Sequence, residues 1–132
     1  LPMGAVLFGE KVESHITAGS HGSTFGGNPV AAAGAVSIVE RIDDEFMKTV
    51  FEKSEYIMKF LKSVNGVKSI SGMGLMLGIE TGKDAKEVVN ACLEKGLLVL
   101  TAKTKIRLLP ALNISYEEID KGLNILKEVI EK

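Results

Sequence analysis

The residues of this chain that are best suited to chemistry gather in one loop, GSHGSTFGGN, at positions 19–28. Glycine lets the main chain approach a ligand closely, and consecutive backbone N–H groups together with the hydroxyls of Ser23 and Thr24 can surround an anion such as a phosphate. The loop lacks the lysine of the GxxxxGK[ST] motif and does not fit GxGxxG. From composition alone an exposed turn explains the same residues equally well, so both interpretations stay open.

Arg107 is the second candidate for a binding role. It lies within the apolar stretch 106–109, where an unpaired guanidinium facing a core would be costly. The chain contains two arginines against fourteen lysines, and the planar, permanently charged guanidinium suits two-point capture of a carboxylate in a way that lysine does not. Arg107 is therefore a candidate carboxylate-binding residue, although an edge strand that points this side chain into water would explain it too.

The other residue types that often carry chemistry favour structural roles. His15 and His21 lack the carboxylate or cysteine partners of a metal site, so no metal is expected. Cys92 falls on the apolar face of a predicted helix, which favours a core position over a nucleophile. A single cysteine excludes an internal disulfide and is typical of a reducing compartment, so a cytoplasmic location is expected.

Length and composition describe an ordinary globular chain. Its 132 residues are enough for one domain with a core, and they are 45% hydrophobic and 25% charged with a formal net charge of -1. This balance argues against a nucleic-acid partner and against a disordered segment. No apolar run approaches the roughly 18 residues that cross a bilayer, and the start lacks the basic lead of a secretory signal, so no membrane partner is expected.

Two elements are predicted on either side of the loop. The apolar residues 5–8 predict a short buried strand. After the loop, Asn28 and Pro29 form a favourable helix start, and a helix is expected over 29–42. Its many alanines carry little side-chain bulk, which predicts a buried helix that another backbone approaches closely.

The second half of the chain predicts an α+β fold. Periodic apolar residues predict helices, and Asp84 and the sequence Ser115-x-x-Glu118 supply start signals for two of them. Helices are expected from 43 to about 65, from 84 to about 96 and from 115 onward, and strands at 67–71, 75–80, 97–100 and 105–109, with a hairpin turn at 72–74. From Val67 the order is ββαββα, which predicts a mainly antiparallel sheet with helices on one face.

Four segments together resemble the class III pyridoxal-phosphate-dependent aminotransferases. The loop segment is the most specific of them, and within the class it favours the branch that acts on acetylornithine and ornithine. The segments are LPMGA at 1–5, GSHGSTFGGNP at 19–29, GMGLMLGIE at 72–80 and IRLLPAL at 106–112. The resemblance extends along the whole chain.

The resemblance implies that the chain is the C-terminal portion of a fold-type I aminotransferase. Residues 1–28 would form the edge of the cofactor domain with its phosphate loop, 29–42 a connecting helix, and 43–132 the C-terminal small domain, a mainly antiparallel sheet covered by helices. Members of the family are homodimers whose two active sites share residues across the interface.

The resemblance also implies roles for three side chains. Thr24 would donate its hydroxyl to the phosphate of pyridoxal 5'-phosphate bound by the neighbouring subunit, Ser23 would lie at the substrate, and Arg107 would hold a substrate carboxylate. No residue of this chain would be catalytic, because the family's Schiff-base lysine is expected a few residues upstream of Leu1. We therefore expect the chain to be a fragment of a longer protein that is inactive by itself.

The resemblance finally implies a reaction for the intact protein, the transfer of an amino group between N-acetylornithine and 2-oxoglutarate in arginine biosynthesis. Ornithine and succinyldiaminopimelate stay open as alternative amino donors, because the residues that select the far end of the substrate lie mostly outside this chain. A non-catalytic α+β module that binds a small anion or a protein partner is the alternative from another class. It explains the second half of the chain but not the loop and the alanine-rich helix.

Overall fold

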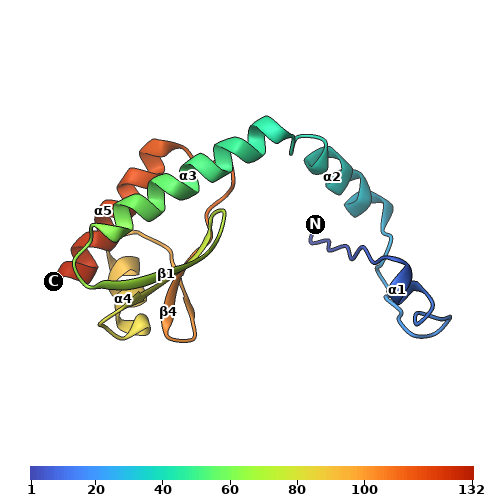
Figure 1. Cartoon of the computed structure of the whole chain (residues 1–132), viewed down its shortest axis with the longest axis horizontal. Coiled ribbons are helices and arrows are strands. Elements are labelled where there is room, and N and C mark those ends of the chain that lie inside the picture. The colour runs from blue at the N-terminus through green and yellow to red at the C-terminus, as the bar shows by residue number, and fades with distance from the viewer. The chain divides into compact units, whose positions relative to one another are not determined.

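The first part of the chain contains two helices and no strand. The computed structural model describes all 132 residues and divides into two compact units, Leu1–Asp44 and Glu45–Lys132 (Figure 1). The first unit holds the short helix α1 (Glu10–Glu13) and the helix α2 (Pro29–Val39). The loop that carries the candidate anion-binding residues lies between these two helices.

The start of α2 follows the local sequence. The side chain of Asn28 accepts hydrogen bonds from the amides of Val30 at 3.0 Å and Ala31 at 3.1 Å, and Pro29 takes the first helical position. The prediction that this helix is buried is wrong for the chain as described, because every residue of α2 is at least partly exposed. Small residues permit a close approach, but the first unit supplies no second element of comparable length to make it.

The strand predicted at residues 5–8 is absent. These residues have no regular secondary structure and are all exposed. A strand needs a neighbour to pair its backbone N–H and C=O groups, and every strand of the protein's one sheet comes from the second unit. An apolar run without a pairing strand therefore forms no regular secondary structure.

The second unit is an α+β domain on a four-stranded antiparallel sheet, which confirms the predicted fold class. The strands are β1 (Val67–Met73), β2 (Met76–Thr81), β3 (Leu100–Ala102) and β4 (Lys105–Leu108), in the spatial order β1-β2-β4-β3. The helices are α3 (Asp44–Lys62), α4 (Ala85–Glu94) and α5 (Tyr116–Glu131). None of the protein's helices combines the length and the apolar character needed to span a membrane.

One face of the sheet carries the core. Side chains alternate along a strand, so Leu77 and Ile79 of β2 share a face with Ile106 of β4, and each is at most 1% exposed. The three helices cover this face with the fully buried side chains Leu61, Val88, Cys92 and Leu126. The prediction that Cys92 is a core residue is confirmed.

Turn geometry fixes both hairpins of the sheet. The hairpin predicted between β1 and β2 is confirmed, but its turn lies at 74–75 and not at 72–74. Gly74 has φ +55° in the turn, whereas Gly72, at φ +137°, pairs with Leu77 within β1. The strand predicted at 97–100 lies further along the chain, as β3 at Leu100–Ala102. Its pairing with β4 around a tight turn places Leu100 opposite Arg107 and leaves the residues before Leu100 unpaired in the sheet. The register of a hairpin depends on where its turn falls, and the apolar run alone does not reveal this.

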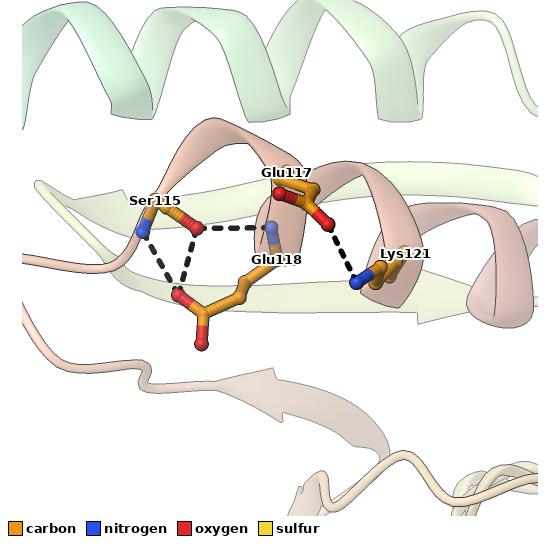
Figure 2. A network of polar contacts seen from close by, with 4 residues as sticks. All are labelled: Ser115, Glu117, Glu118 and Lys121. Carbon is orange, nitrogen blue, oxygen red and sulfur yellow. Dashed lines mark hydrogen bonds and ion pairs between the residues drawn. The ribbon is translucent and has the colours of Figure 1, made fainter.

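The final helix begins with the predicted capping box (Figure 2). The amide of Glu118 donates to the hydroxyl of Ser115 at 3.2 Å, while the amide and the hydroxyl of Ser115 donate to the Glu118 carboxylate at 3.1 and 2.8 Å. One turn further on, Lys121 bonds Glu117 at 2.8 Å. The box satisfies backbone groups that the first turn of a helix leaves unpaired, and the prediction is confirmed.

The end of the same helix holds a second polar cluster. Glu128 accepts hydrogen bonds from Lys132 at 2.6 Å and from Lys95 at 2.9 Å, so it links α5 to the end of α4. These bonds favour the ionised carboxylate and lower the pKa of Glu128 from 4.5 to about 2.

Candidate functional site

The loop predicted to bind an anion is shaped by its glycines. The amide of Gly26 donates to the carbonyl of Ser23 at 3.4 Å. A Cβ on Gly26 would lie 3.0 Å from the Cβ of Ser23, and Gly27 has φ +69°, a conformation that side chains disfavour. The tight turn after Ser23 therefore depends on glycine at both positions.

This turn leaves hydrogen-bond donors free. The hydroxyls and amides of Ser23 and Thr24 form no hydrogen bond within the chain, and every residue of the loop is exposed. Uncommitted N–H and O–H groups shortly before a helix N-terminus are the donor set that a phosphate takes. By its chemistry the loop fits a cofactor that carries a phosphate, and the individual roles of Ser23 and Thr24 stay predictions.

Arg107 lies on the face of the sheet opposite the core. It pairs with Gly78 of β2 on one side and Leu100 of β3 on the other, whereas its neighbour Ile106 points into the core. The alternative of an edge strand is wrong, because β4 lies between β2 and β3. The side chain is half-buried, its Nε is buried without a hydrogen-bond partner, and none of the four ion pairs of the structure involves it.

An apolar cavity of about 390 Å³ adjoins Arg107 between the end of β4, the segment before β3 and α5. Arg107 is the only cation in its wall and Glu118 the only carboxylate. That carboxylate accepts hydrogen bonds from the amide and the hydroxyl of Ser115. Both bonds lower the pKa of Glu118, the amide more than the hydroxyl. The guanidinium thus has no counterion of its own, which suits capture of a carboxylate from outside the chain.

The candidate residues fall into two groups. Ser23 and Thr24 lie in the first unit, and Arg107 lies in the second. Two polar residues that the sequence did not single out lie on the same face of the sheet as Arg107, namely Lys105 on β4 and Ser71 on β1. The spacing of Lys105 two residues before Arg107 could have revealed it, whereas Ser71 requires the strand register. No three His, Cys, Asp or Glu side chains converge as a metal site would require.

Comparison with known proteins gives one consistent result. The profile of the aminotransferase class-III family matches residues 1–130. The acetylornithine aminotransferase of Haemophilus ducreyi is 42% identical over 134 residues, which cover 100% of this chain and 34% of that protein. Solved structures of the acetylornithine aminotransferase from Elizabethkingia anophelis and the ornithine delta-aminotransferase from Plasmodium falciparum superpose with TM-scores of 0.72 and 0.73 at 28% and 27% identity. The first match includes 90% of this chain and 34% of the solved chain, and the second includes 91% and 33%. The chain therefore spans about a third of the length of the relatives it matches.

Proposed function

Because the chain belongs to the class-III aminotransferases, we propose that it is part of an enzyme that transfers the amino group of N-acetylornithine to 2-oxoglutarate in arginine biosynthesis. The observation that carries this proposal is the match of the entire chain to acetylornithine aminotransferases, at 42% and 43% identity in two bacteria. A half-buried Arg107 without a counterion supports it, because both proposed substrates carry a carboxylate.

The first unit would contribute to cofactor binding. Pyridoxal 5'-phosphate, the cofactor of this family, supplies an electron sink for the carbon that bears the amino group. The free hydroxyl of Thr24 and the neighbouring amides would hold its phosphate, since they have no acceptor within the chain. In the proposed homodimer this phosphate would belong to the cofactor of the other subunit.

The second unit would orient the substrate. A two-point contact between Arg107 and the substrate carboxylate fixes the rotation of the substrate, and such positioning contributes strongly to rate. Ser23 of the first unit would lie at the substrate as well. Ser23, Thr24 and Arg107 would all position their ligands, and the proton transfer would belong to a lysine expected outside residues 1–132. We therefore expect these residues alone to form no glutamate.

The proposal is tested with the full-length protein that contains this chain, supplied with pyridoxal 5'-phosphate. We expect glutamate to form from 2-oxoglutarate with N-acetylornithine as the best amino donor among N-acetylornithine, ornithine and succinyldiaminopimelate. Ornithine is the strongest alternative, because solved ornithine aminotransferases match this chain as well as an acetylornithine aminotransferase does. A clear preference for another donor would replace the proposed substrate, and no transfer from any donor would favour the non-catalytic module.

Paired variants separate the two binding roles. Thr24→Ala should weaken the binding of pyridoxal 5'-phosphate in an absorbance titration, whereas Thr24→Ser, which keeps the hydroxyl, should retain most of it. Arg107→Lys should raise the KM for the substrate while cofactor binding is retained, because the ammonium keeps the charge but loses the two-point geometry. Arg41→Lys is the matched control, since Arg41 is exposed and its side chain donates to the hydroxyl of Ser37 four residues earlier.

A further inference from the structure

Two methionines oppose each other at the tip of the hairpin between β1 and β2. Met73 is the last residue of β1 and Met76 the first of β2, and the two are paired directly across the turn. Directly opposed residues of an antiparallel pair have Cβ atoms about 5 Å apart and share a face of the sheet. The next residue of β2, Leu77, is 1% exposed in the core, so the two thioethers project from neighbouring positions on the opposite face.

Both thioethers are open to solvent, unlike the other methionines of the second unit. Met73 is 81% exposed and Met76 is 54% exposed. On α3, by contrast, Met47 is 36% exposed and Met58 packs against the hydrophobic core. A methionine is oxidised to its sulfoxide only when an oxidant reaches the sulfur. The hairpin tip is therefore the part of this unit where a thioether should react first.

The hairpin tip is held in place from its other side. The hydroxyl of Ser54, which lies on α3 and is 3% exposed, donates to the carbonyl of Gly74 in the turn at 2.7 Å. Leu75, the second residue of the turn, is 2% exposed and belongs to the core. Neither Met73 nor Met76 is among the residues that pack against this core. An oxygen added to either sulfur would therefore be hydrated, and no core contact would be lost.

We propose that Met73 and Met76 form a peroxide-sensitive modification site, at which oxidation makes the hairpin tip polar while the domain stays folded. Hydrogen peroxide is the oxidant. The sulfur lone pair attacks one peroxide oxygen, an S–O bond forms and the O–O bond breaks. The hydroxyl on sulfur gives its proton to the departing hydroxide, which leaves as water. Each sulfur loses two electrons and each peroxide gains two, and a sulfoxide reductase that draws two electrons from thiols reverses the change.

The test treats the folded full-length protein with increasing hydrogen peroxide and measures the gain of one oxygen at each methionine by peptide mass spectrometry. We expect Met73 and Met76 to be oxidised about fivefold or more faster than Met58, because reactivity follows access to the sulfur. In urea these methionines should react at similar rates, which would assign the order to the fold. The test does not depend on the proposed function, because it needs neither substrate nor cofactor.

A double variant, Met73→Leu/Met76→Leu, tests the consequence of oxidation. Leucine keeps the apolar volume and has no sulfur to oxidise. The oxidised wild type should keep its Tm within about 2 °C of the untreated protein, as expected for a change at the surface, and a methionine sulfoxide reductase should restore its original mass. Met47→Leu is the matched control and should leave oxidation of the tip unchanged.

Two results would overturn the proposal. The first is oxidation of Met73 and Met76 that is no faster than that of Met58 in the folded protein. The second is a fall in Tm on oxidation that the double variant does not share, because the two sulfoxides would then disrupt the domain.

Discussion

Replacing Arg107 with methionine should stabilise the second unit while it removes carboxylate binding. The Nε of Arg107 is buried without a partner, and an unmade hydrogen bond to a buried donor costs about 1–3 kcal/mol. We expect the lower end, about 1 kcal/mol, because the residue as a whole is half-buried and the rest of its guanidinium can be hydrated. Methionine keeps an unbranched apolar stem that can lie along the wall of the apolar cavity beside β4.

Thermal unfolding of the chain, followed by circular dichroism, measures this effect. A gain of about 1 kcal/mol raises the Tm of a unit of this size by about 4 °C or more. The control is Lys86→Met, which also exchanges a positive charge for methionine but at an exposed position of α4, and it should change the free energy of unfolding by less than about 0.5 kcal/mol. Glutarate should raise the Tm of the wild type and leave that of Arg107→Met unchanged.

Two outcomes would refute the reasoning. A lower Tm for Arg107→Met would mean that the guanidinium makes favourable contacts even without a ligand. An equal rise in Arg107→Met and Lys86→Met would mean that the change in net charge, and not the unpaired Nε, is responsible.

Three further predictions concern the second unit. Gly96→Ala should lower the free energy of unfolding by about 1 kcal/mol, because Gly96 has φ +83° but open space around it. Gly72→Ala should cost at least about 2 kcal/mol more, because its Cβ would overlap the carbonyl oxygen of Met76. Equal losses for the two variants in urea unfolding would contradict this. Glu128, whose folded pKa of about 2 lies below its ordinary 4.5, contributes stability that is present above 4.5 and lost as the pH falls toward 2. Glu128→Gln should therefore lose less stability than the wild type in an acid titration across that range, and identical titrations would exclude the two lysines as the cause. Burial raises the pKa of the Cys92 thiol, so iodoacetamide should label it slowly in the native protein and rapidly in urea, and rapid native labelling would place it outside the core.

The elements that the sequence predicted well are those with local signals. The Ser115 capping box and the Asp84 and Asn28 caps need only three or four neighbouring residues to form, and each is found where it was expected. The hairpin between β1 and β2 depends on two glycines with positive φ, which the glycine-rich turn supplied directly.

The errors occur where the outcome depends on a partner distant in sequence. Residues 5–8 have the composition of a strand but no strand to pair with. The strand predicted at 97–100 begins only at Leu100, because its pairing with β4 starts there, opposite Arg107. The same limit applies to the site. The sequence could nominate Arg107 by its rarity, but only the register shows that Ser71, Gly78 and Arg107 lie in one row.

The capping box of α5 also shapes the wall of the cavity beside Arg107. Glu118 is the only carboxylate in that wall, and the amide and the hydroxyl of Ser115 hold it at the helix start. A substitution at position 115 would free the carboxylate from this position as well as weaken the helix. One serine therefore serves both the stability of α5 and the arrangement of the cavity's single acidic group, so a change there alters both together.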